Sequence, residues 1–330
     1  MRIKPIHLII LIFIVFSLFS NLNTFESIEN KLQDSLLQSK KEIDTRIVII
    51  AIDDYSLGNL GKWPWARSVH GQLLDKVSQG NPAVIGVDIM FSEEDQNLEQ
   101  DEALQQAMVK AGNVVLPVYA TFDRKTRAGE MIGKSLVEPI KPLKAVTTTG
   151  HINTFPDSDG IVRKTILHYS YNDEMKKSFA WMIFEKYTKK MGMDTDFEKI
   201  PLDQWNRMYI DYTGEPSDFE YLSYDKVLMG EIPPEYFEDK IVLIGPYTVG
   251  IDDYYFTPLA HESPMYGVEI HANIIQNLLY GNYKQYVPFV INLAGLLLLS
   301  LIGWYAFNKF SPLKSLLILA AVISLSQSIA

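Results

Sequence analysis

The sequence predicts an α/β protein: a mostly parallel sheet flanked by helices, with an inserted β-hairpin and with transmembrane helices at both ends. Three observations lead to this prediction. Short aliphatic runs alternate with amphipathic segments, an Asp-Ser-Asp-Gly turn separates two alternating runs, and long apolar stretches occupy both ends. With 330 residues, 47% of them hydrophobic, the chain is long enough for one large domain or two ordinary ones.

The first part of the sheet is predicted from three aliphatic strands. Residues 47–52 (IVIIAI) form an unbroken aliphatic run between charges, which is typical of a strand covered on both faces. Residues 83–91 and 113–120 have a similar character. Between the strands, residues 69–77 and 98–111 place apolar side chains at helical spacing, and a glycine follows each segment. Alternation of strands and helices at this spacing is typical of a parallel sheet with right-handed crossovers.

The middle of the chain departs from this alternation. Residues 150–154 are predicted to pair with residues 162–169 as a β-hairpin across the Asp-Ser-Asp-Gly turn. A further helix over 26–42 is expected to precede the first strand. The remaining predicted elements are a helix at 179–191, a strand at 208–212, a strand at 241–245 and a helix at 267–279.

Both ends of the chain have the composition of membrane spans. Residues 6–22 contain no charge and approach the minimum length of about 17 residues for a transmembrane helix. A poor cleavage site after them favours an uncleaved anchor over a signal peptide. Residues 287–307 are a second predicted span and 313–330 a third. We expect the third to be truncated and the sequence to be a fragment of a longer protein.

The basic residues predict the topology. Residues 1–5 and the loop 308–312 carry Lys and Arg, so both are expected in the cytoplasm. Residues 23–286 then form an extracytoplasmic domain of a multi-pass protein in the plasma (inner) membrane. This domain holds all 40 acidic residues and 26 of the 30 basic ones, a net charge of about −14. Such acidity argues against nucleic acid as a partner and against adsorption to anionic lipid.

Several kinds of chemistry find no support in the sequence. The chain has no cysteine, which excludes thiol catalysis, Cys-ligated zinc and iron–sulfur sites. It has no glycine-rich nucleotide motif, no G-x-S-x-G and no H-E-x-x-H. His271 stands on a mostly apolar helical segment, and we interpret it as a buried, hydrogen-bonded residue rather than a ligand. We therefore expect no enzymatic activity from this stretch, and no cofactor is evident.

Carboxylates follow several of the predicted strands. Asp53 and Asp54 follow the first, Asp88 ends the second, and Asp252 follows the last. Ligands of parallel α/β sheets gather at the carboxyl ends of strands, and hard cations prefer carboxylate oxygens. These residues are therefore candidate ligand-binding residues, and a divalent cation is a candidate cofactor, although the metal site itself is unknown. In the alternative interpretation, Asp53 and Asp88 pair with Arg67 or cap helices.

The segment GKWPWARSVH places two indoles on a stiff turn. Pro64 fixes its own φ and drives Trp63 towards an extended conformation, and Trp65 follows directly. Each indole can bury on the order of 200 Å². The three residues could form an aromatic ligand cage, but we interpret them as a structural motif that packs a loop over the strand end.

Arg67 is the residue of this segment with the strongest functional interest. It lies at the predicted start of a helix with Ser68 as a plausible N-cap, a position where a cation is unfavourable without a nearby carboxylate. We expect Asp53 or Asp54 to supply that carboxylate. Arg67 would then be either a structural lock or the anion-binding half of a polar site.

Five ordered segments give the chain a family resemblance. IVIIAIDDYSLGNLGKWPWARSVHGQLLDKV is similar to the signature of the second class of CHASE domains, which are extracytoplasmic sensory domains associated with cyclases and histidine kinases. GVDIMFSEE, GHINTFPDSDGIVRK, KIVLIG and MYGVEIHANIIQNLL also resemble segments of that family, which together cover about residues 46–279. The resemblance implies one helix before the domain, commonly three after it, and a cytoplasmic cyclase or kinase output that this sequence does not contain.

Three hypotheses for function remain. The first is a membrane-anchored sensory input domain of a bacterial signal-transduction receptor, with an unknown extracytoplasmic stimulus, the lipid bilayer and a second copy in a homodimer as partners. The second is an exported metal-assisted hydrolase that uses the acidic strand ends. The third is a structural module that dimerises the membrane helices.

Overall fold

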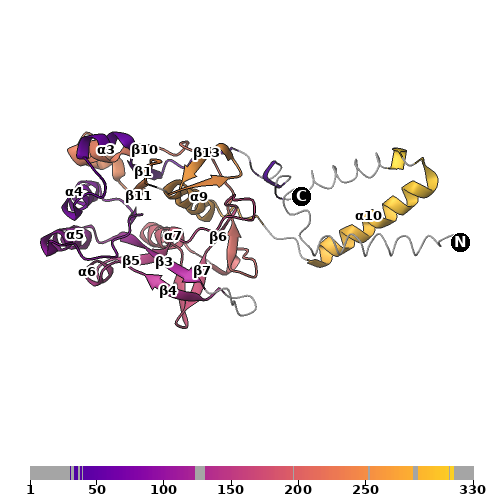
Figure 1. Cartoon of the computed structure of the whole chain (residues 1–330), viewed down its shortest axis with the longest axis horizontal. Helices are drawn as coiled ribbons and strands as arrows, with labels where there is room; N and C mark the ends of the chain where they lie inside the picture. The colour runs from indigo at the N-terminus through magenta and orange to yellow at the C-terminus, as the bar shows by residue number, and fades with distance from the viewer. Residues whose placement is uncertain are drawn as a thin grey trace. The chain divides into compact units, whose positions relative to one another are not determined.

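The computed structural model describes residues 30, 33–35, 38, 40–122, 131–195, 197–251, 253–284, 289–311 and 313–315. The chain forms two compact units, which we describe separately. One unit is Ser39–Lys284, and the other consists of Met1–Gln38 with Gln285–Ala330. The first unit contains the sheet and the helices that cover it (Figure 1).

A seven-stranded sheet forms the centre of Ser39–Lys284 in the described residues. Six of its strands run parallel in the order β10-β1-β11-β2-β3-β5, and β4 pairs antiparallel with the second half of β3. The strands are β1 (Ile47–Ile52), β2 (Val84–Val87), β3 (Val114–Phe122), β4 (Gly133–Val137), β5 (Thr148–His151), β10 (Tyr221–Ser223) and β11 (Ile241–Pro246). This arrangement confirms the predicted α/β class and the mostly parallel sheet.

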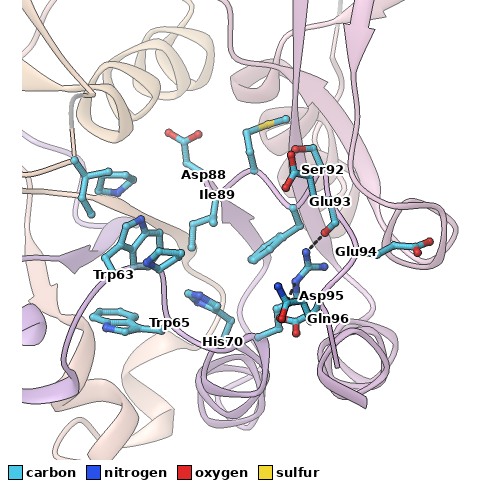
Figure 2. A pocket seen from close by; sticks show the side chains of 16 residues that line it. Trp63, Trp65, His70, Asp88, Ile89, Ser92, Glu93, Glu94, Asp95 and Gln96 are labelled. Carbon is cyan, nitrogen blue, oxygen red and sulfur yellow. Dashed lines mark hydrogen bonds and ion pairs between the residues drawn. The ribbon is translucent and has the colours of Figure 1, made fainter. Parts of the chain in front are cut away.

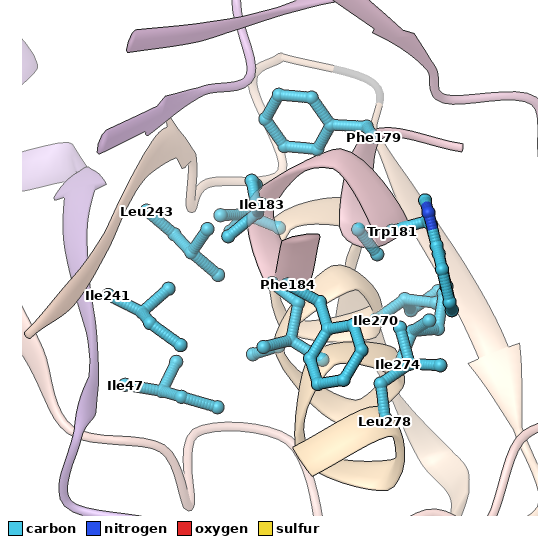
Figure 3. Packing of buried hydrophobic residues seen from close by; sticks show 14 of the residues in the cluster. Ile47, Phe179, Trp181, Ile183, Phe184, Ile241, Leu243, Ile270, Ile274 and Leu278 are labelled. Carbon is cyan, nitrogen blue, oxygen red and sulfur yellow. The ribbon is translucent and has the colours of Figure 1, made fainter. Parts of the chain in front are cut away.

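Two hydrophobic cores lie on opposite faces of the sheet. Val48 and Ile50 point to one face, where they join side chains of α4 (Arg67–Ser78), α5 (Leu98–Ala111) and α8 (Tyr224–Met229). Ile47 and Ile49 point to the other face, where α7 (Phe179–Met191) and α9 (Gly267–Tyr280) pack (Figures 1 and 3). Because successive side chains of a strand alternate between faces, burial of both faces requires the unbroken aliphatic run.

Two of the helices that flank the sheet begin and end where the sequence predicts, whereas the helix predicted at 69–77 extends from Arg67 to Ser78. Asn97 caps α5 by accepting from the Glu99 N–H at 3.1 Å, and Ser178 caps α7 by accepting from the Trp181 N–H at 3.2 Å. Gly112 ends α5 with a φ of +70°, a left-handed conformation that costs glycine least. The predicted bounds of the helices at 98–111 and 179–191 are confirmed.

The predicted hairpin between 150–154 and 162–169 is wrong. In the described residues, β5 instead pairs in parallel with β3, β6 (Lys164–Ile166) pairs with β9 (Arg207–Tyr209), and a single bridge, Thr154 to Thr165, joins the two predicted arms. Arg163 holds the acidic turn from inside: its guanidinium, 1% exposed, donates to Asp157 Oδ2 at 3.1 Å and to Asp159 Oδ2 at 2.8 Å. Ion pairs with this buried Arg therefore hold the turn in place.

A different hairpin occurs further along the chain. Strands β7 (His168–Tyr171) and β8 (Glu174–Lys177) join through Asn172 and Asp173, which both have positive φ, as the tightest hairpin turns require. The remaining elements are α3 (Asp54–Leu60), α6 (Lys141–Lys144), β12 (Tyr254–Thr257), β13 (Ala260–Tyr266) and short 3-10 helices at Phe197–Lys199 and Pro234–Phe237. Of the helix predicted over 26–42, residues 30 and 33–35 are helical and residues 40–42 are not.

The second unit contains helix α10 (Phe289–Lys309), which occupies the stretch predicted as the second membrane span. The predicted span at 6–22 and most of 313–330 lie outside the described residues. Within the described residues, no helix has both the length and the apolar content of a membrane span.

The contact between β2 and α7 makes Gly86 a test of the packing. A Cβ at this position would lie 2.4 Å from Ile183 Cδ1 and 3.0 Å from Leu243 Cδ2. We expect Gly86→Ala to lower the free energy of unfolding by about 1–3 kcal/mol, because the packed neighbours must shift. Denaturant titration measures the change. Gly58→Ala is the matched control, because a Cβ added at this helical glycine would meet no neighbouring atom within 4 Å. It should leave the free energy of unfolding unchanged or raise it by up to about 1 kcal/mol. Equal effects of the two substitutions would contradict this packing.

Candidate functional site

A cavity of about 740 Å³ opens above the carboxyl ends of the parallel strands (Figure 2). Three segments line it: residues 63–70 after β1, residues 88–96 after β2, and the region of Pro246 and Ile251 at the end of β11. Loops meet at this edge because parallel strands all end there, and in open α/β sheets ligands bind at the same place. The volume lies within the range of small-molecule sites.

One wall of the cavity is aromatic. Trp63 and Trp65 meet edge to face with their ring centroids 5.2 Å apart, and Trp63 meets His70 in the same way at 5.7 Å. Trp65 is 8% exposed, and its indole N–H donates to the Gly61 carbonyl at 2.9 Å. Trp63 is only half-buried, and it follows that Trp65 supports the wall while Trp63 keeps part of its ring accessible. The Trp63–Pro64 peptide bond is cis.

The predicted pairing of Arg67 with Asp53 or Asp54 is wrong. Arg67 forms an ion pair with the buried Asp101 of α5, and its Nε lies 3.9 Å from an Asp95 oxygen. The side chain reaches α5 because α4 begins at Arg67 itself and lies directly beside α5. The guanidinium also donates to the Glu93 carbonyl and lies 5.5 Å from the centre of the Phe91 ring.

Ser68 is not the N-cap that its position predicts. Ala66 occupies the N-cap of α4 without a side-chain hydrogen bond. The backbone N–H of Ser68 instead donates to Gln100 Oε1 at 2.9 Å. A side chain of α5 thus caps the start of α4. Local sequence does not indicate this contact, because Gln100 is 32 residues from Ser68.

Asp53 and Asp54 hold strand ends together and do not line the cavity. Asp53 caps α3 by accepting from the Ser56 N–H at 2.9 Å and the Ser56 hydroxyl at 2.6 Å. Its second oxygen accepts from the Ser223 hydroxyl at the end of β10. Asp54 accepts from the Thr248 hydroxyl just after β11. The hydrogen bonds of Asp53 to Ser56 agree with the alternative interpretation, in which Asp53 caps a helix.

Asp88 is the sequence-predicted carboxylate that the structure places in the cavity wall. It is 7% exposed, and burial together with the nearby Asp253 carboxylate raises its pKa well above the usual value. Burial likewise raises the pKa of Asp253. His271 of α9 has its Nε2 3.8 Å from Asp88 Oδ2, but burial lowers the pKa of His271 to about 4. The imidazole is therefore neutral at pH 7, and Asp88 has no charged partner in it.

The predicted convergence of acidic residues on one cation is not found in the part of the chain that the structure describes. No three His, Asp or Glu side chains there are placed to hold a metal ion. Asp252 lies outside the described residues, so the divalent cation stays a prediction. Sequence reasoning missed its neighbour Asp253 as the partner of Asp88; the Asp252-Asp253 doublet after the last strand was the available signal.

His70 is a second residue of the cavity that the sequence did not single out. Its Nδ1 lies 2.8 Å from the hydroxyl of Tyr224, and burial with the Arg67 charge lowers the pKa of His70 to about 4. The ring is therefore neutral at pH 7. The aromatic wall thus adds no positive charge to the cavity.

The Arg67–Asp101 pair should carry much of the stability of the cavity rim. We expect Arg67→Met to lower the free energy of unfolding by about 3–5 kcal/mol, because Asp101 stays buried without a counter-charge. Adding Asp101→Asn should recover most of the loss, since Asn can still accept from the Asp95 N–H. Lys110→Met breaks an exposed pair with Asp75 and should cost less than about 1 kcal/mol in the same denaturant titration. No recovery in the double variant would contradict this account.

Burial of neutral His70 should make stability depend on pH. In the unfolded chain this histidine binds a proton near pH 6.5, whereas in the folded protein it does so only near pH 4. The unfolded state therefore binds more protons as the pH falls through this window, and stability decreases towards low pH. Between pH 7.5 and 5 the wild type should lose about 2 kcal/mol more than His70→Gln.

Denaturant titrations at the two pH values measure this difference. Tyr224→Phe removes the hydrogen bond to His70 but keeps the histidine, so its pH dependence should match the wild type. An identical pH dependence in His70→Gln and wild type would show that another group is responsible.

Comparison with known proteins gives a family match. The family model described as the CHASE2 domain matches residues 8–305, most of the chain. No curated protein and no solved structure matches. The match confirms the resemblance that the five sequence segments indicate, and the chain belongs to the CHASE2 domain family.

Proposed function

We propose that the chain is the sensory input part of a membrane-anchored receptor and that a small-molecule stimulus binds in the cavity above the sheet. CHASE2 domains are extracytoplasmic sensory domains of signal-transduction receptors. The observation that carries the proposal is the cavity itself, because three strand-end loops form it and a ligand there would contact all three. A separate cytoplasmic domain of the receptor would give the output.

Contacts between the cavity and α9 offer a route for the signal. Asp88 in the cavity wall faces His271 of α9. Gly245 of β11 fits closely between Asp88 and Val268 of α9: a Cβ there would lie 3.2 Å from Asp88 Cβ and 3.1 Å from Val268 Cβ. A ligand that bound one arrangement of Asp88 more tightly would shift the population of α9 positions by that difference in affinity.

Helix α9 is well placed in the sequence to pass such a shift onwards. It ends at Tyr280 with Gly281 as its C-cap, a few residues before the predicted span at 287–307. The apolar runs at 6–22, 287–307 and 313–330, with basic residues at 1–5 and 308–312, support the membrane anchoring in this proposal. A homodimer would let two copies of the following helix move against each other.

The absence of cysteine makes the topology testable without background. Glu102→Cys introduces a thiol at an exposed position of α5, and Ser311→Cys introduces one in the predicted cytoplasmic loop. In intact cells a membrane-impermeant maleimide should label Glu102→Cys and leave Ser311→Cys unlabelled, because only the first thiol lies outside the membrane.

Cell lysis provides the control, since both thiols should then react. The cysteine-free wild type should remain unlabelled in either preparation. Labelling of Ser311→Cys in intact cells, or protection of Glu102→Cys, would overturn the proposed orientation.

A further inference from the structure

The chemistry of the cavity narrows the kind of stimulus it can take. We propose that the cavity selects a small organic cation, an ammonium group joined to an apolar or aromatic body. The inference rests on the proposed function, because it assigns a ligand class to the same cavity. Three features of the wall lead to it: its charge, its accessible aromatic ring and its buried carboxyl group.

Acidic side chains outnumber basic ones in the cavity wall. Asp88, Glu93, Glu94 and Asp95 supply four carboxyl groups, and Arg67 is the basic residue among the lining side chains. The Arg67 guanidinium is already engaged by the buried Asp101, which does not line the cavity, and by Asp95. An anionic ligand would therefore meet carboxylates without a free cation among the described lining residues.

The aromatic wall adds a second preference for positive charge. Trp63 is half-buried and lines the cavity, and the rings of Trp65 and His70 contact it edge to face. Indole faces attract ammonium groups, and the interaction strengthens when water is excluded. Trp63 and Asp88 both line this cavity (Figure 2), so a ligand that fills it could contact both.

Asp88 provides the anchoring group. It is buried next to a second carboxyl group, Asp253, and the neighbouring His271 is neutral at pH 7. A buried carboxylate is costly without a counter-charge, and a ligand ammonium would supply one. A neutral ligand would leave Asp88 as it is, and no described group of three residues is placed to hold a bare metal ion.

A matched set of three probes separates these possibilities. Phenethylammonium, 2-phenylethanol and phenylacetate share one aromatic body and carry a positive, a zero and a negative charge. Isothermal titration calorimetry of the full chain in detergent at pH 7.5 should show phenethylammonium binding at least about tenfold more tightly than the other two. Its affinity should fall as salt is added, because exposed carboxylates of the rim contribute.

Variants assign the selectivity to the cavity. Asp88→Asn keeps the shape of the side chain and should weaken phenethylammonium by about tenfold while leaving 2-phenylethanol unchanged. Trp63→Leu removes the indole face and should weaken it by about threefold to tenfold. Glu102→Gln removes an exposed carboxylate of α5 outside the cavity and should have no effect.

The outcomes separate this inference from the proposed function. Tighter binding of 2-phenylethanol or phenylacetate, no binding of phenethylammonium, or equal binding to wild type and Asp88→Asn would each overturn the cationic ligand. None of these results changes the side of the membrane on which the domain lies, which the cysteine labelling measures. Failure of the labelling experiment would overturn the receptor topology even if the cation binds.

Discussion

The fold depends on the burial of both faces of the central strands β1 and β11. Every residue of β1 is inaccessible, and alternate side chains enter two separate cores. A polar residue at any of these positions would place an unsatisfied group in one core or the other. Polar chemistry is therefore excluded from the strands and begins at their carboxyl ends, where the chain leaves the sheet and the cavity opens.

Short polar contacts fix the loops at that edge. Asp53 ties the end of β1 to Ser223, and Asp54 ties the start of α3 to Thr248. Arg67 fastens the rim to α5 through Asp101. The carboxylates of Asp53, Asp54 and Asp101 are thus all engaged in contacts within the fold. They do not line the cavity, whereas Asp88, Trp63 and the acidic stretch after β2 do.

Asp88 lies where the cavity wall meets helix α9. It lines the cavity and also lies close to Asp253 and His271. Burial of these three side chains disfavours the charged form of each. Such a site responds to any change in its counter-charge, because the dielectric around it is low. Asp88 is thus placed between the cavity and α9, the last helix described in Ser39–Lys284.

The sequence by itself determined the elements that are marked by local patterns, namely the spacing of apolar side chains and the residues that end helices. The aliphatic runs at 47–52 and 241–245 gave two-sided strands, and the apolar spacing and terminal glycines of 98–111, 179–191 and 267–279 gave helices. Strand alternation was sufficient to predict a parallel sheet, and the cavity lies at the carboxyl edge where a ligand site is expected. The five segments that resemble the CHASE2 family were likewise recognisable from the sequence, and the family match confirms them.

Only the tertiary structure decided which side chains meet. Arg67 is 14 residues from Asp53 but pairs with Asp101, because the start of α4 faces α5 and not the end of β1. The predicted hairpin failed because a turn signal does not specify strand partners: β3 and β9 compete for the two arms, and the buried Arg163 holds the turn. Likewise the electrostatic interaction of Asp88 with Asp253 joins residues 165 positions apart. Pairings over such separations depend on how helices pack on the sheet, which local pattern does not encode.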